Sequence, residues 1–188
     1  MSDTVLVVED ERDLADLYAD WLADEYDVRV AYTAQEALET VDDEVSVVLL
    51  DRRLPDRPGS EVLATIRERG LECRVAMVTA VDPDFDIVEM GFDDYLVKPV
   101  SRAELRETVD GLLSQRSYDE RMREYAALAR KRAVLESEKD QAKLAENEAY
   151  QELLERLDEL SGEVDDLVAG FDEQAFSAAF RDLEQADE

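Results

Sequence analysis

Apolar segments of strand length alternate with amphipathic segments of helix length through the first 116 residues of the chain. Strands are expected near residues 4–8, 28–31, 46–50, 74–79 and 94–97. Helices are expected near residues 11–23, 34–42, 59–69, 84–90 and 101–116. Such alternation favours parallel strands joined by crossover helices, and continuous apolar strands are typical of a sheet covered on both faces. The pattern predicts an α/β fold with a five-stranded parallel doubly wound sheet.

Five polar side chains stand where the expected strands end: Glu9, Asp10, Asp51, Thr79 and Lys98. In a parallel sheet these ends share one edge, where open α/β sheets bind their ligands. Three neighbouring carboxylates repel one another unless a proton or a cation intervenes, and Mg²⁺ prefers such hard oxygen ligands together with phosphate. The ammonium and the hydroxyl suit phosphoryl oxygens. Asp51 can therefore act as a nucleophile that forms an aspartyl phosphate.

The composition excludes several classes of protein. The net charge is −29, from 50 acidic and 21 basic residues, which is typical of a halophilic protein with a hydrated acidic surface. The chain contains no histidine, which rules out a phosphohistidine carrier, a histidine-ligated metal and a Ser–His or Cys–His pair within it. Cys73 is the single cysteine, so no disulfide framework exists within the chain. Without an apolar run of signal-peptide or membrane-span length, we expect a soluble cytoplasmic protein with no membrane association.

The character of the chain changes after Gln115. From Arg116 to about Leu160 there is no glycine or proline, and the composition predicts a long helix. Its apolar residues recur at three- and four-residue spacings, in stripes that fit either a helical hairpin or a coiled coil between chains. Ser161-Gly162 and Gly170 are expected to interrupt the helix. We therefore expect two domains, residues 1–116 and an α-helical C-terminal region over residues 117–188.

The last expected element is a short helix with an aromatic face formed by Phe171, Phe176 and Phe180, followed by a frayed QADE tail. The only basic island lies further upstream, over residues 116–143, with the run Arg130, Lys131 and Arg132. Nucleic-acid contact through these three residues competes with a solvated helix face and with a partner-binding or dimerising helical module. No helix-turn-helix pattern is visible, so DNA binding stays open.

The segments VVEDE, DRRLPDRPG, VTA and DDYLVKP, in this order, resemble the four signatures of the receiver domain of two-component response regulators. The resemblance covers residues 3–116 and implies a CheY-like, flavodoxin-like sheet with strand order 2-1-3-4-5. The arginine-bearing helical region and the acidic, phenylalanine-containing end resemble the haloarchaeal HalX-type response regulators. Together they imply a signalling phosphoprotein of a phosphorelay, with transcription regulation as one expected output.

The resemblance assigns roles to the residues at the strand ends. Asp51 would accept a phosphoryl group from a sensor histidine kinase, with Lys98 as its phosphate partner. Mg²⁺ would be held by Glu9, Asp10, Asp51 and the backbone carbonyl of Arg53. The protein would not be an enzyme beyond slow self-dephosphorylation.

The resemblance also implies a conformational switch. Thr79 and Tyr95 would form the switch pair, and Pro99 would follow a cis peptide bond that places the Lys98 ammonium. Phosphorylation would reshape the face formed by the helix near 84–90, the strand 94–97 and the helix 101–116. A homodimer could form through that face or through the C-terminal helices.

Two other functions compete with a phosphorylation-gated response regulator. One is a metal-dependent phosphatase with an aspartyl intermediate, which usually places the nucleophile after the first strand with a second aspartate two residues on. Here the first strand is followed by Glu9-Asp10-Glu11. The other is a scaffold or adaptor that does not bind DNA, whose receiver would be degenerate; the intact set of five residues argues against it.

Overall fold

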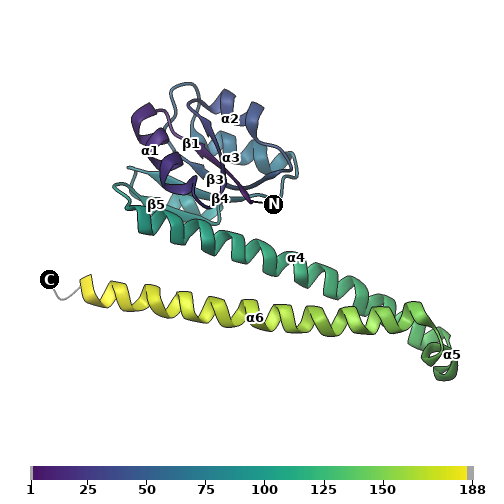
Figure 1. The fold of residues 1–188 in the computed structure, drawn as a ribbon. Helices are drawn as coiled ribbons and strands as arrows, with labels where there is room; N and C mark the ends of the chain where they lie inside the picture. Colours follow the sequence, from purple (N-terminus) through teal and green to yellow (C-terminus); the bar gives the residue numbers. More distant parts are fainter. Residues whose placement is uncertain (1, 186–188) are drawn as a thin grey trace. The chain divides into compact units, whose positions relative to one another are not determined.

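The computed structural model describes the backbone of residues 2–185 and the side chains of residues 2–170. The chain divides into two compact units, Met1–Leu113 and Ser114–Glu188, each of which is considered by itself (Figure 1). The division into domains expected after residue 116 stays a prediction. None of the described helices combines the length and the apolar composition that crossing a bilayer requires.

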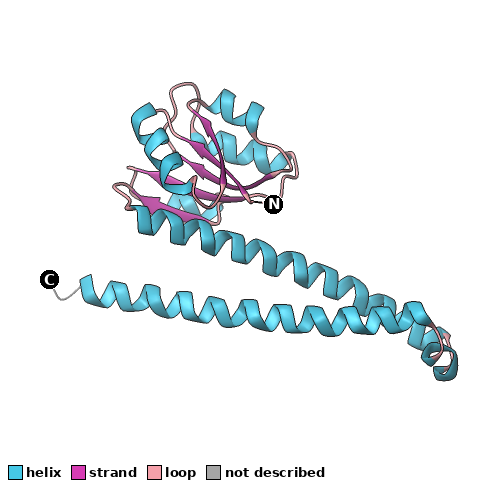
Figure 2. Ribbon diagram, in the orientation of Figure 1, coloured by secondary structure: helices cyan, strands magenta, loops and turns pink. Residues whose placement is uncertain are grey.

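The first unit contains a five-stranded parallel sheet with the strand order β2-β1-β3-β4-β5, which confirms the predicted fold class (Figure 2). The elements, in chain order, are β1 (Thr4–Val8), α1 (Arg12–Leu22), β2 (Asp27–Ala31), α2 (Ala34–Thr40), β3 (Val45–Leu50), α3 (Gly59–Glu68), β4 (Arg74–Thr79), the 3-10 helix η1 (Phe85–Glu89), β5 (Asp94–Val97) and the first part of α4 (Arg102–Glu138).

Helices cover both faces of this sheet. Successive strand side chains point to opposite faces, so Val5 and Val7 of β1 pack with α1 and α4, whereas Leu6 and Val8 pack with α2 and α3. Each helix buries one stripe; in α4 of this unit it consists of Leu105, Val109 and Leu112. The three middle strands are buried on both faces, which explains why they read as nearly unbroken apolar runs.

The helix expected near residues 84–90 is present only as a short 3-10 helix. The chain there forms only the five-residue 3-10 helix η1, which begins where the Asp84 side chain accepts a hydrogen bond from the amide of Phe85 at 2.7 Å. Phe85 and Val88 are 90% and 80% exposed. Without an apolar stripe packed on the sheet, tertiary contacts do not stabilise a longer helix, and most helical stability in proteins comes from such packing.

The second unit is helical, but the prediction of one long helix from Arg116 to about Leu160 is wrong. Besides the rest of α4, it contains α5 (Gln141–Ala145) and α6 (Glu148–Gln185). The chain leaves the α4 helix after Glu138, and the Asn147 side-chain oxygen caps α6 by accepting a hydrogen bond from the Tyr150 amide at 3.0 Å.

The helical hairpin, one of the two arrangements left open by the sequence, is the one seen within this unit. Arg156 of α6 donates to both carboxylate oxygens of Glu124 on α4, at 2.8 and 3.0 Å, and Arg121 pairs with Glu163. Leu144, Tyr150, Leu157 and Leu160 are buried.

The prediction that Ser161-Gly162 and Gly170 interrupt the helix is also wrong, because α6 continues through these positions. A glycine inside a helix costs about 0.5–1 kcal/mol relative to alanine, which the packing of neighbours such as Leu157 and Leu160 can offset. The backbone of residues 171–185 belongs to this same helix, not to a separate short one. The expected aromatic face of Phe171, Phe176 and Phe180 lies outside the described side chains. The QADE tail begins at the last described backbone position, and the rest of it lies outside the described residues.

Candidate functional site

The candidate site lies at the carboxyl edge of the sheet. Backbone hydrogen bonds continue the strand register into it: the Glu9 amide donates to Ala31 at 3.0 Å, the Asp51 amide to Val8 at 2.9 Å and the Lys98 amide to Thr79 at 2.9 Å. The sheet thus holds residues from distant parts of the chain next to one another.

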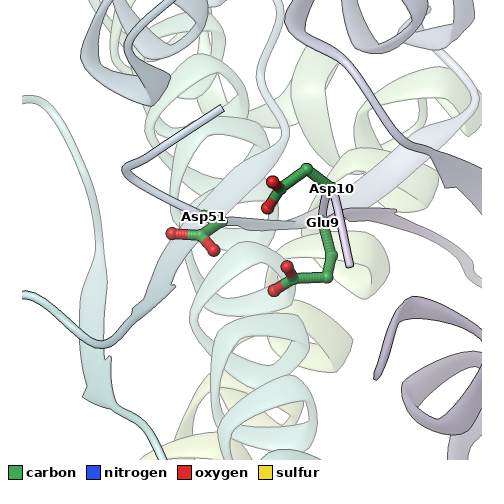
Figure 3. A group of neighbouring side chains, drawn as sticks. All are labelled: Glu9, Asp10 and Asp51. Carbon is green, nitrogen blue, oxygen red and sulfur yellow. The ribbon is translucent and has the colours of Figure 1, made fainter. Parts of the chain in front are cut away.

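Three carboxylates meet at this edge. Oxygens of Glu9, Asp10 and Asp51 all lie within 4.8 Å of one another, and Figure 3 shows the three side chains gathered together. Glu9 and Asp51 are 3% and 6% exposed, whereas Asp10 is open to solvent. A site that concentrates negative charge on hard oxygen donors, with one side open, fits a partly hydrated Mg²⁺ ion.

Lys98 contributes the only ammonium that the described structure places on this cluster. Its Nζ donates to Asp51 Oδ2 at 2.8 Å and also pairs with Glu9. Burial lowers the pKa of Lys98, but the hydrogen bonds to Asp51 and Glu9 outweigh it, so the pKa is raised overall. The pKa of Glu9 is raised as well. The main cause is burial of its carboxyl group, which outweighs the lowering effect of the hydrogen bond from Lys98. The raised pKa of Lys98 is the direction expected for an ammonium next to two carboxylates.

The other oxygen of Asp51 is held by the loop that follows β3. Asp51 Oδ1 accepts a hydrogen bond from the Arg53 amide at 3.1 Å. The peptide bond between Lys98 and Pro99 is cis. The structure therefore places Asp51 between a backbone amide on one oxygen and the Lys98 ammonium on the other.

Thr79 and Tyr95 both contact the backbone of Val81. The Val81 amide donates to Thr79 Oγ1 at 3.3 Å, and the Tyr95 hydroxyl donates to the Val81 carbonyl at 2.7 Å. Thr79 is buried and Tyr95 is half-buried, with its ring centroid 5.5 Å from that of Phe92. The two residues expected to act as a pair are thus linked through one intervening residue.

Sequence reasoning missed a role for Arg52. Its guanidinium pairs with Asp86 of η1, and hydrogen bonds to Tyr95 and then Asp86 raise its pKa. Arg52 therefore connects the loop that follows β3 to η1. Its place next to Asp51 was visible in the sequence, but its partners depend on the unexpected 3-10 segment.

Gly59, at the start of α3, was missed as well. Its amide donates to the Arg52 carbonyl at 2.8 Å, and a Cβ at this position would lie 2.1 Å from the Asp51 carbonyl oxygen. Only glycine allows α3 to approach the backbone of Asp51 this closely. The Pro-Gly pair at 58–59 was the available signal, since it marks a turn.

The three cations for which nucleic-acid contact was one of the competing interpretations belong to the second unit. Arg130, Lys131 and Arg132 are exposed on α4, and Arg132 pairs with Glu136 at 2.8 Å.

Comparison with known proteins agrees with this geometry. Residues 5–110 match the family described as response regulator receiver domain, and residues 114–180 match the HalX domain. A curated Haloferax volcanii relative, named "Putative transcriptional regulator", is 53% identical over 160 residues, which are 85% of this chain and 27% of the relative. The chain thus spans only about a quarter of the length of that relative.

Solved receiver structures share the fold of the first unit. A CheY-like receiver domain protein from Methanospirillum hungatei is 25% identical, with a TM-score of 0.58 over 63% of this chain and 99% of that chain. The Thermotoga maritima response regulator TrrA, in complex with Mg²⁺-BeF, is 29% identical, with a TM-score of 0.53 over 59% of this chain and 99% of that chain. The chain therefore belongs to the response regulator receiver family and carries a HalX domain after its receiver domain.

Proposed function

We propose that this protein is a phosphorylation-gated response regulator in which Asp51 accepts a phosphoryl group from a sensor histidine kinase. The observation that carries the proposal is the position of Asp51 Oδ2, 2.8 Å from the Lys98 ammonium and beside the carboxylates of Glu9 and Asp10. An ammonium next to an acidic cluster is more useful to a transferred phosphoryl group than to a metal alone.

Transfer begins when an Asp51 carboxylate oxygen attacks the phosphorus of a phosphohistidine on the kinase. The new O–P bond forms as the P–N bond breaks, and the departing imidazole nitrogen keeps the electron pair. Lys98 would neutralise one phosphoryl oxygen, and the Thr79 hydroxyl would donate to another. The Arg53 amide, 3.1 Å from Asp51 Oδ1, orients the nucleophile.

The residues present suit Mg²⁺ as the cofactor. Glu9, Asp10, Asp51 and the Arg53 carbonyl would hold the ion, which supplies further neutralisation of phosphoryl charge when bound. The Mg²⁺-BeF complex of the TrrA relative supports this assignment. The excess of carboxylates over cations in the cluster supports it independently.

Phosphorylation would act on the output through Thr79 and Tyr95. A Thr79 hydroxyl that turns toward the phosphoryl group gives up its contact with the Val81 amide, and Tyr95 is held by the carbonyl of the same residue. Movement at Val81 would therefore change both contacts, and the populations of two arrangements would shift. A curated relative bears the name "Putative transcriptional regulator", which supports transcription regulation as the output that the HalX region would give to this shift.

Acetyl phosphate with Mg²⁺ tests the proposal without the kinase. Intact mass spectrometry of the full chain should show one added phosphoryl group in the wild type and none in Asp51→Asn. Asp43→Asn, an exposed acid in the loop before β3, is the matched control and should be labelled like the wild type. Equal labelling of wild type and Asp51→Asn would refute Asp51 as the acceptor.

A further inference from the structure

The second unit contains an apolar groove that the phosphoacceptor proposal does not use. It lies between the end of α4 and the start of α6, offers about 580 Å³ and is floored mainly by Val134, Leu135, Ala149, Tyr150 and Leu153. Val134 is 60% exposed. A volume of this size is in the range that takes up one or two large apolar side chains.

Basic side chains line the groove and the pocket next to it. Arg130 and Lys131 line it, and Lys139 and Lys143 line an adjoining pocket that shares Leu135 and other walls with it. Among the residues whose side chains the structure describes, these four cations form no ion pair. In a chain with a net charge of −29, such a cluster attracts acidic groups.

The groove combines an apolar floor with a basic rim, which consists of Arg130, Lys131, Lys139 and Lys143. This combination favours one kind of partner. Large apolar side chains would fill the floor while neighbouring carboxylates pair with the rim. The phosphates of a nucleic acid would use the rim but leave the exposed floor, including Val134, uncovered. The groove therefore fits an acidic, aromatic peptide segment better than a nucleic acid.

The chain carries such a segment at its own end. Residues 171–188 contain three phenylalanines, six acidic residues and one arginine. Residues 171–185 of this segment cannot reach the groove of their own molecule while α6 is intact, because their backbone belongs to one continuous helix over Glu148–Gln185. At 1.5 Å per residue, Phe171 lies roughly 30 Å along the axis from Tyr150.

We propose that the groove binds the acidic, phenylalanine-bearing segment 171–188 of a second copy of the chain. If each copy offers both its groove and its segment, the exchange is reciprocal and closes as a two-fold dimer. This inference goes beyond the phosphoacceptor function and does not depend on Asp51, since every residue that carries it belongs to the second unit.

Charge reversal on each side of the contact tests the pairing. The mass of the full chain is measured by size exclusion with light scattering, over a range of protein concentrations at one KCl concentration. The rim variant is Lys131→Glu with Lys143→Glu, and the segment variant is Asp182→Lys with Glu184→Lys. Each should weaken the wild-type dimer at least about tenfold, and combining all four changes should restore most of the loss.

Matched variants separate the contact from other effects. Asp20→Lys with Asp43→Lys adds the same positive charge on exposed positions of the first unit and should leave the dimer unchanged. Phe176→Ala with Phe180→Ala tests the apolar half without changing charge and should also weaken the dimer. Circular dichroism checks that each variant keeps its helix content. Asp51→Asn should dimerise like the wild type, so a failure of the dimer proposal can be told apart from a failure of the phosphoacceptor proposal.

Several results would overturn the inference. The wild type could stay monomeric at every concentration. The wild-type dimer could be weakened by neither the rim variant nor the segment variant. The combined variant could fail to regain the dimer affinity that each variant loses alone. If the wild type is monomeric and binds a DNA duplex, and the rim variant does not bind it, the rim would contact nucleic-acid phosphates instead of a second copy of the chain.

Discussion

The Lys98 ammonium and the Asp51 carboxylate are 47 positions apart in the chain and 2.8 Å apart in space. Their strands are not neighbours, because β4 lies between β3 and β5. Lys98 thus reaches across the end of β4, where Thr79 is buried, to bind a carboxylate at the end of β3.

Replacing Lys98 with methionine should destabilise the protein in a way that depends on pH. The change leaves the buried carboxylates of Glu9 and Asp51 without their cation, and breaking a buried pair typically costs about 3–5 kcal/mol. The cost should shrink in acid, where the Glu9 carboxyl, whose pKa is raised mainly by burial, takes up a proton. Urea titrations without Mg²⁺ near neutral pH and at about pH 4 measure it. Lys139→Met, at an exposed position, is the control, and an equal loss at both pH values would contradict the argument.

Mg²⁺ should stabilise the folded wild type, because it would bind the acidic cluster only when the strand ends are assembled. At a free concentration of 100 Kd the gain is about 2.7 kcal/mol, measurable as a rise in Tm. Asp10→Asn should abolish most of this rise while leaving the Mg²⁺-free stability nearly unchanged, since Asp10 is exposed. An exposed acid outside the cluster, changed in Asp43→Asn, provides the comparison. A Tm rise that survives Asp10→Asn would place the ion elsewhere.

Glu9 should make the Mg²⁺-free protein less stable as pH rises. Its pKa is raised in the folded state above the ordinary 4.5, mainly by burial, so the folded protein holds a proton that the unfolded chain has already released. Between these two pKa values the free energy of unfolding falls with increasing pH, and below both the stabilisation is complete. Glu9→Gln should flatten this part of the profile, as a series of denaturant titrations would show. If the free energy of unfolding changed with pH in the same way in the wild type and in Glu9→Gln, Glu9 would not be the source of the pH dependence.

The fold and the site of the first unit were largely predictable because they follow from strand ends. Once TVLVV, VSVVLL and RVAMVT are recognised as buried parallel strands, Glu9, Asp51 and Thr79 must share an edge. The pairing of Arg52 with Asp86 was not predictable. It depends on where a five-residue 3-10 helix places one carboxylate, and the apolar periodicity near residues 84–90 falsely indicated a longer helix.

In the second unit, helical content was predictable but its breaks were not. Residues 116–160 contain no glycine or proline, and single weak helix formers such as Asp140 and Asn147 do not by themselves locate a turn. Asn147 can cap a helix, but that becomes decisive only when α6 packs against α4 through pairs such as Arg156 with Glu124. Gly162 suggests a break in sequence, yet the tertiary packing of α6 outweighs the modest cost of one glycine.

Alanine substitutions at two glycines should have opposite effects. In Gly59→Ala the new Cβ would lie 2.1 Å from the Asp51 carbonyl oxygen, so α3 or the loop that follows β3 must shift, with an expected loss of about 2 kcal/mol or more and weaker labelling by acetyl phosphate. In Gly162→Ala the Cβ meets nothing within 4 Å inside α6, and higher helix propensity should stabilise the second unit by about 0.5–1 kcal/mol. Thermal unfolding followed by circular dichroism, with labelling measured in parallel, separates the two. If Gly162→Ala lowered the Tm, the continuous α6 helix would be wrong at this position, whereas unchanged labelling in Gly59→Ala would show that the Asp51 loop tolerates the displacement.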